Sequence, residues 1–130
     1  MHRESFELPA DAAAVSDARE RVCGQLRDWG LPEDVGHAAQ LVISEFFTNV
    51  VVHTDTDRVR CRLQTDGQRL RIEVFDEGGG LCDPTPREAE PEDVNGRGLK
   101  LVNAVAETWG VQSGVRPGRL VWAELSLPAR

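Results

Sequence analysis

The spacing of apolar residues predicts two helices in the first half of the chain. Asp11 is a suitable N-cap for a helix that runs to about Trp29, and Gly30 ends that helix. A second helix begins near Pro32 and runs to about His53. Because this second helix is apolar around most of its circumference, we expect it to be buried.

Beyond the second helix the pattern changes to alternation, which is typical of strands. Residues 59–63 and 70–74 alternate between apolar and mostly charged side chains, and a turn at 66–67 joins them. This predicts an antiparallel pair with one face in water. A short edge strand is predicted at residues 6–8 and a loop at 83–93. A further helix is predicted at 98–108, and a closing hairpin is formed by 110–113 and 119–127.

Together these elements predict a single α+β domain over residues 1–130. We expect a two-layer sandwich in which one antiparallel or mixed sheet carries helices on one face. Hydrophobic residues at 40% and charged residues at 28% are ordinary for such a domain.

Charge and composition exclude several classes of partner. The formal net charge is −7, and an acidic domain binds nucleic acid poorly because duplex affinity depends on basic residues. We find no run of about 20 apolar residues and no signal peptide, so we expect no membrane partner. Cys23, Cys61 and Cys82 lack C-x-x-C spacing, which favours reduced thiols in a cytoplasmic protein.

A carboxylate and an amide interrupt the long apolar helix. Glu45 and Asn49 are four residues apart and therefore share one side of the helix. An Asn oxygen can bind Mg²⁺ beside phosphates, and a neighbouring carboxylate can accept a proton from a nucleophilic hydroxyl. The same residues would also fit a thin solvated stripe, so the pair alone leaves both interpretations open.

Asp76 follows a predicted strand and precedes a run of glycines. A buried Asp at a strand end can accept a hydrogen bond from an exocyclic amine such as that of adenine. Gly78 and Gly80 would let the backbone approach a flat base closely. An ordinary Asp-x-Gly turn would have the same sequence.

A second glycine motif, Asn95-Gly96-Arg97-Gly98-Leu99, precedes the predicted third helix. Backbone N–H groups at a helix start can bind a phosphate, and Arg97 would add positive charge. A flexible turn with an N-cap is the alternative. Neither a Walker P-loop nor a complete dinucleotide-binding fingerprint is present.

The order and spacing of these motifs resemble the GHKL ATPase/kinase superfamily over about residues 6–127. The three matching segments are Ser44-Glu45-x-x-Thr48-Asn49-x-x-x-His53, similar to the N-box, and Asp76-x-Gly78-x-Gly80 and Gly96-Arg97-Gly98-Leu99-x-Leu101-Val102, similar to the two glycine boxes. The segments 109–111 and 118–125 resemble the actinobacterial anti-sigma-factor serine kinases. The resemblance implies the Bergerat-type α/β sandwich.

The resemblance also implies a role for each motif residue. Asn49 would hold Mg²⁺, Glu45 would be the general base, and Asp76 would bind the adenine of ATP. The remaining residues would form the pocket wall (Gly78 and Gly80) and the phosphate site (Gly96, Arg97, Gly98 and Leu99), under a lid at about residues 81–95.

The function that the resemblance implies is an ATP-dependent serine/threonine protein kinase. Its expected partners are an anti-anti-sigma protein of the STAS type, which it would phosphorylate, a sigma factor that it would sequester, and a second copy in a homodimer. One departure is Leu120, where the family usually has a Thr that joins the adenine-binding Asp through a water. The alternative is therefore a non-catalytic interaction protein of the same fold with weak or no nucleotide binding.

Overall fold

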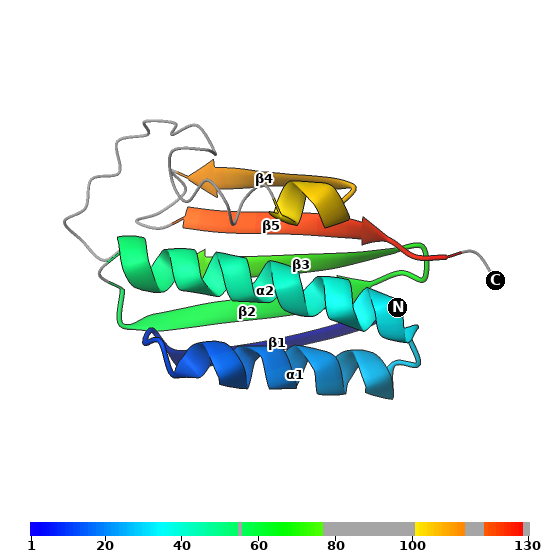
Figure 1. The fold of residues 1–130 in the computed structure, drawn as a ribbon, viewed down its shortest axis with the longest axis horizontal. Helices are drawn as coiled ribbons and strands as arrows, with labels where there is room; N and C mark the ends of the chain where they lie inside the picture. The colour runs from blue at the N-terminus through cyan, green and yellow to red at the C-terminus, as the bar shows by residue number, and fades with distance from the viewer. Residues whose placement is uncertain (55, 77–100, 114–118, 129–130) are drawn as a thin grey trace.

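The chain forms one layer of helices on one layer of strands. The structure is a computed structural model that describes residues 1–54, 56–76, 101–113 and 119–128. The labelled elements in chain order are β1 (His2–Pro9), α1 (Ala14–Asp28), α2 (Glu33–His53), β2 (Arg58–Thr65), β3 (Arg69–Asp76), β4 (Thr108–Ser113) and β5 (Arg119–Ser126) (Figure 1). Residues 101–105 form a further short helical stretch before β4.

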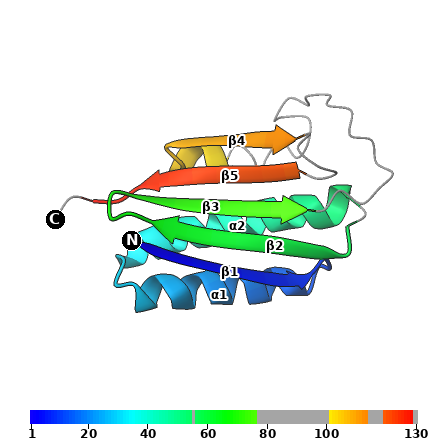
Figure 2. The same cartoon turned by 180° about the vertical axis from the view of Figure 1, so that it is seen from behind.

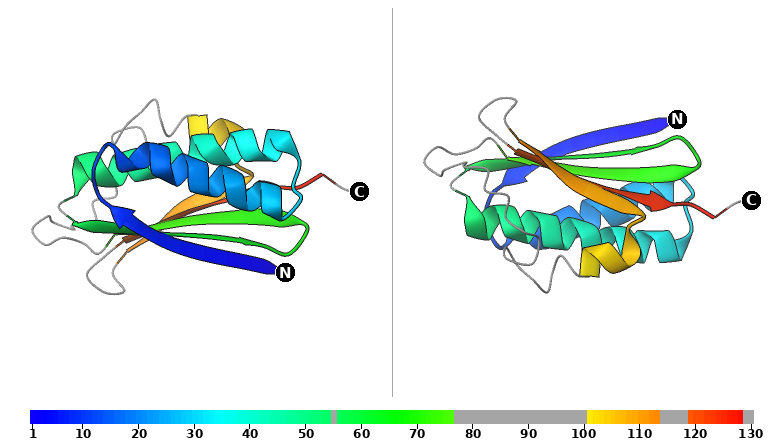
Figure 3. Two further views of the ribbon diagram at one scale, coloured as in Figure 1. Left: turned by 90° about the horizontal axis from the view of Figure 1, so that it is seen from below. Right: turned by 90° about the horizontal axis from the view of Figure 1, so that it is seen from above.

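The five strands make one sheet in the order β1-β2-β3-β5-β4. Every neighbouring pair in this order is antiparallel (Figure 2). Both long helices lie on the same side of the sheet, and no helix of the described residues covers its other side (Figure 3). The predicted α+β sandwich is therefore confirmed, and its sheet is antiparallel rather than mixed.

Alternation along the strands separates a helix-facing side from an open side. Val59, Cys61 and Leu63 of β2 are fully buried under the helices, whereas the arginines between them are exposed. The β2–β3 hairpin turns at Asp66, whose Oδ1 accepts the backbone N–H groups of two following residues at 2.8 and 3.1 Å. These bonds to the charged carboxylate lower the pKa of Asp66. Gly67 takes the positive φ of 96° that the turn requires.

Helix α2 is the central helix, but only one of its sides is fully buried. Seven of its residues contribute to the core: Val35, Ala39, Val42, Ile43, Phe46, Phe47 and Val50. Helix α1 packs beside it through an apolar stripe that includes Ala18, Val22 and Leu26. The expectation that α2 is buried is therefore only partly met, because no element of the described residues covers its side opposite the core.

By length and composition, residues Glu33–Val52 of α2 would suffice to cross a membrane, unlike any other helix in the described ranges. The sequence was expected to contain no stretch long and apolar enough to span a membrane. Helix α2 passes this test because its few charged residues leave its average composition apolar. A core helix of a folded domain passes the same test. Since α2 packs on the sheet and on α1, its composition is weak support for a membrane span.

Two element boundaries differ from the predictions for local reasons. Helix α1 begins at Ala14 rather than after Asp11, because Asp11 closes a preceding turn and its Oδ1 accepts the N–H of Ala14 at 3.0 Å. The helix predicted over 98–108 ends near residue 105, since the Glu107 N–H already donates to the Glu124 carbonyl of β5 at 2.8 Å. The predicted loop at 83–93 lies outside the described residues.

Candidate functional site

Glu45 and Asn49 lie on a half-buried side of α2. Each side chain is partly exposed, in contrast to the core residues Phe46 and Phe47 beside them. Ala38 precedes Glu45 by seven residues, or about two turns, so the two project from the same side of the helix. Ala38 lines a groove together with Val105. This side of α2 therefore faces the helical residues 101–105 and not α1, which lies on the opposite flank (Figure 1).

Asp76 is the last residue of β3 and is almost completely buried. It is 4% exposed and pairs in the sheet with Val59 of β2 and Arg119 of β5. By alternation it shares the helix-facing side of β3 with Ile72 and Val74, which are fully buried. Asp76 is therefore an enclosed carboxylate at a strand end, which is the environment that the adenine-binding interpretation requires.

The topology brings the candidate residues to one end of the sandwich. The C-terminal end of α2, the end of β3 and the start of β5 all lie at the same end (Figure 1). Asn49 is in the last turns of α2, and Asp76 ends β3, on which α2 packs. The two glycine motifs and the expected lid, residues 78–80, 96–99 and 81–95, lie outside the described residues.

Leu120 does not lie where the resemblance would place it. It pairs with Phe75 in the β3–β5 ladder, one residue away from the Asp76–Arg119 pair. Directly paired residues project to the same side, so Leu120 and Phe75 occupy the open side while Asp76 faces the helices. The expectation that Leu120 points at the base beside Asp76 is therefore wrong.

The residues present fit a bound Mg²⁺-nucleotide. Glu45 and Asn49 offer a carboxylate and an amide oxygen, the ligand types that Mg²⁺ prefers. Across the described ranges no group of three or more His, Cys, Asp or Glu side chains gathers into a metal site. Mg²⁺ usually takes few protein ligands and completes its shell with phosphates and waters. The buried carboxylate of Asp76 could accept a hydrogen bond from an exocyclic amine such as that of adenine.

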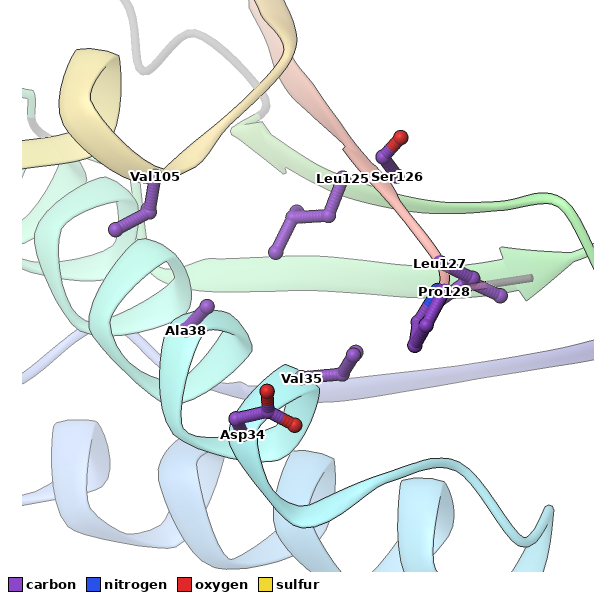
Figure 4. A pocket seen from close by; sticks show the side chains of 8 residues that line it. All are labelled: Asp34, Val35, Ala38, Val105, Leu125, Ser126, Leu127 and Pro128. Carbon is purple, nitrogen blue, oxygen red and sulfur yellow. The ribbon is translucent and has the colours of Figure 1, made fainter. Parts of the chain in front are cut away.

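A groove of about 400 Å³ lies at the other end of the molecule (Figure 4). Its lining comes from the first turns of α2, from Val105 and from the end of β5: Asp34, Val35, Ala38, Val105, Leu125, Ser126, Leu127 and Pro128. Six of its eight lining residues are apolar, and the groove lies at the N-terminal end of α2, away from Asp76. It is therefore a separate feature and not the predicted nucleotide site.

Comparison with known families agrees with the fold. Residues 8–124 match the family described as the histidine kinase-like ATPase domain. The chain belongs to this family. Membership makes it a domain of the GHKL ATPase/kinase type, for which ATP binding is the general property. No curated protein matches the chain.

Solved structures share the fold of this ATPase domain. The RsbU and RsbW domains of a Mycobacterium tuberculosis protein align with 100% of this chain at 23% identity and a TM-score of 0.70. A blue-light activated histidine kinase from Erythrobacter litoralis aligns with 75% of it at 26% identity and a TM-score of 0.57. The histidine kinase AdeS of Acinetobacter baumannii aligns with 99% at 13% identity and a TM-score of 0.53. This chain spans only 34% of the Mycobacterium chain, 32% of the Erythrobacter chain and 70% of AdeS.

Proposed function

We propose that this ATPase domain is a serine/threonine protein kinase of the anti-sigma type. It would bind Mg²⁺-ATP and transfer the terminal phosphoryl group to a serine of an anti-anti-sigma protein of the STAS type. The observation that carries the proposal is that the C-terminal end of α2, the helix that carries Glu45 and Asn49, lies at the same end of the sandwich as the buried Asp76 of β3, on which α2 packs. Family membership supports the proposed binding of ATP. The motif resemblance supports the proposed transfer of the phosphoryl group to a serine.

Asp76 would select the base. Its carboxylate is enclosed on the helix-facing side of β3, where competing water is largely excluded. A charged acceptor in such a place forms a strong hydrogen bond with an exocyclic amine. Gly78 and Gly80 would complete the wall of this pocket, and Gly96, Arg97, Gly98 and Leu99 would hold the phosphates.

Glu45 and Asn49 would act at the phosphate end. The Asn49 amide oxygen would hold Mg²⁺, which when bound neutralises charge that develops on the phosphates. Glu45, one turn earlier on the same side of α2, would accept the proton of the attacking serine hydroxyl at a carboxylate oxygen. Removal of that proton makes the hydroxyl a better nucleophile, and the spacing keeps base and metal ligand adjacent.

The same proposal extends to partners and location. A sigma factor would be a second protein partner, a homodimer would be the working assembly, and the cytoplasm would be the compartment. The acidic net charge supports protein partners rather than nucleic acid. The alternative of a non-catalytic interaction protein depended on Leu120, and Leu120 faces away from Asp76.

A phosphotransfer assay tests the proposal. The purified chain would be incubated with γ-labelled Mg²⁺-ATP and a STAS-type anti-anti-sigma protein from the same genome. We expect label on a serine of the STAS protein, and a rate about 10²–10⁴-fold lower in Glu45→Gln. Glu20→Gln on the exposed surface of α1 is the matched control and should keep the normal rate.

Two results would contradict parts of this proposal. An unchanged rate in Glu45→Gln would show that Glu45 is not the base. ATP binding without any transfer to the STAS protein would favour the non-catalytic interaction protein.

A further inference from the structure

The open side of the sheet is rich in arginine although the chain as a whole is acidic. By register, the described strands place six arginines and three glutamates on this side: Arg3, Arg58, Arg60, Arg62, Arg69 and Arg71, with Glu7, Glu73 and Glu124. A fourth glutamate, Glu107, precedes β4 and pairs with Arg69 at 2.9 Å. The formal charge of this side is therefore positive, whereas the whole chain carries −7. Figure 2 shows this side turned toward the viewer, with α1 and α2 behind the sheet.

The glutamates of this side are shared between arginines. Glu7 pairs with Arg58 at 3.4 Å and with Arg60 at 3.6 Å, and the side chains of both arginines remain about half exposed. Glu73 is shared in the same way between two further arginines, at 3.2 and 2.7 Å. Each guanidinium has five N–H donors. The donors therefore outnumber the acceptors, and the arginines can bind additional carboxylates.

Aromatic rings hold some of these arginines in place. The Arg71 guanidinium lies 4.5 Å from the centroid of the Trp122 ring, and Arg60 lies 6.0 Å from the Phe75 ring. A stacked, planar guanidinium loses less conformational freedom when it binds a carboxylate. The Trp122 ring itself lies against Gly110, where an added Cβ would come within 2.9 Å of it.

The centre of this side is partly apolar. Phe75 and Leu120 are directly paired across β3 and β5, and Trp122 lies two residues farther along the same side of β5. All three are half-buried. Aromatic residues and arginine are the types most enriched in protein interfaces, where a fairly apolar centre is surrounded by a polar rim.

From these observations we infer that the open side of the sheet is a docking surface for an acidic protein partner. The partner would place an apolar side chain on Phe75, Leu120 and Trp122 and carboxylates on the surrounding arginines. This surface is opposite the helix-facing side that holds Asp76, so the inference does not depend on the proposed kinase activity.

A protein partner fits this surface better than the two alternatives. Nucleic acid would bring a regular series of closely spaced phosphates near Glu7, Glu73 and Glu124. A second copy packed face to face would oppose arginines to arginines. An acidic protein segment avoids both conflicts, since it can place each carboxylate beside a guanidinium.

A defined acidic peptide tests the inference. The probe is a fluorescent peptide of alternating Glu and Leu or Phe residues, titrated into the full chain at low and at physiological salt. We expect binding that weakens with salt and that falls roughly tenfold or more in Arg58→Glu/Arg60→Glu. Arg19→Glu/Arg27→Glu, on exposed positions of α1, makes the same charge change and should retain binding.

Each other outcome decides against the inference. Failure of the peptide to bind, or equal loss in the α1 control, would overturn it. Preferential binding of a single-stranded oligonucleotide that needs Arg58 and Arg60 would assign the surface to nucleic acid. Self-association in sedimentation that the Arg58/Arg60 variant abolishes would assign it to a second copy. The double variant Arg58→Gln/Arg60→Gln removes the positive charges without introducing negative ones, so it is less prone to misfold than the glutamate variant. It should also lose most of the peptide binding.

Discussion

Glu73 is the most enclosed charged side chain on the open side of the sheet. It is 8% exposed and lies between Arg62 and Arg71, with its closest contact at 2.7 Å. Arg71 also donates to Glu124 at 2.9 Å. Burial lowers the pKa of Arg71, but its hydrogen bonds to Glu73 and Glu124 raise it by more, so the guanidinium stays charged. Glu73 therefore balances charge at a partly buried position.

We expect Glu73→Gln to lower the free energy of unfolding by roughly 1–3 kcal/mol, because a buried carboxylate that accepts two charged donors is replaced by a neutral amide. Urea denaturation at neutral pH measures the change. Glu7→Gln is the control, since Glu7 also pairs with two arginines but is 38% exposed in its side chain. Its loss should stay below about 1 kcal/mol. If the two variants lost equal free energy of unfolding, solvent would screen the ion pairs of Glu73 and Glu7 to the same extent.

Cys61 gives a pH-dependent test of the core. Burial raises the pKa of its thiol from 9.0 to about 12, against a small opposing effect of Arg21. The folded chain thus favours the neutral thiol, and this stabilisation is complete below pH 9 and is lost as the pH rises toward 12. At pH 10 the loss relative to pH 7 should be about 1.4 kcal/mol.

Cys61→Val should remove this part of the alkaline loss, because valine has no thiol to ionise. Urea denaturation at pH 7 and pH 10 measures it as the difference between the variant and the original chain. Cys23→Val, at a half-buried position on α1, should leave the alkaline loss unchanged. If Cys61→Val lost stability between the two pH values as steeply as the original chain, ionisation of Cys61 would not be the cause.

At the scale of the elements, strand register decides which residues can reach the nucleotide. Leu120 is paired with Phe75 and lies on the open side, whereas its neighbour Val121 is paired with Val74 and packs on the core. We therefore expect Leu120→Thr to leave the affinity for Mg²⁺-ATP within about twofold, since a hydroxyl there cannot join Asp76. Calorimetric titration of both proteins tests this. Tightening by the two- to tenfold that a new neutral hydrogen bond would give would place Leu120 at the base.

The elements themselves were largely predictable from the sequence. Alternation identified the strands and the side on which each residue lies. A shift of the pairing register by one residue would turn every buried side chain of β2 and β3 to the exposed side, so the pattern fixes the register. The end of the third helix was not predictable, because Thr108 joins β4 through pairing with distant residues of β5. The helical spacing of the apolar residues near Val105 and Ala106 does not indicate that pairing. Helix α2 was predicted with nearly correct ends, since Pro32 and its following acids begin a helix by local chemistry alone.

At the scale of the whole molecule, the candidate site depends on where distant elements end. The sequence indicated that Glu45 and Asn49 share one side of a helix, and it placed Asp76 at a strand end. It could not by itself bring these together, because the packing of α2 on β3 is a tertiary contact. The motif resemblance supplied that link. The arginine-rich open side was visible as alternation, but its ion pairs and ring contacts required the register of β1, β2, β3 and β5.

Binding of nucleotide should stabilise the whole fold, which gives a test of the site that needs no partner. At about 100 times its dissociation constant, Mg²⁺-ATP should add about 2.7 kcal/mol. For a domain of 130 residues this corresponds to a rise in Tm of roughly 10 °C. Asp76→Asn should lose about 1.5–3 kcal/mol of binding free energy, because a charged acceptor is replaced by an amide. Its rise at the same ATP concentration should then be half of the original or less.

Each variant is compared with its own Tm without ATP, so that a change in intrinsic stability does not enter the comparison. Asp57→Asn is the matched control, since Asp57 is exposed in the turn before β2 and does not belong to the predicted site. It should show the full rise. An Asp76→Asn rise equal to that of the control would remove Asp76 from the adenine site. No rise in the original chain would favour an interaction protein that keeps the fold of an ATPase without its ligand, and the docking surface on the open side would then be the more informative place to seek its function.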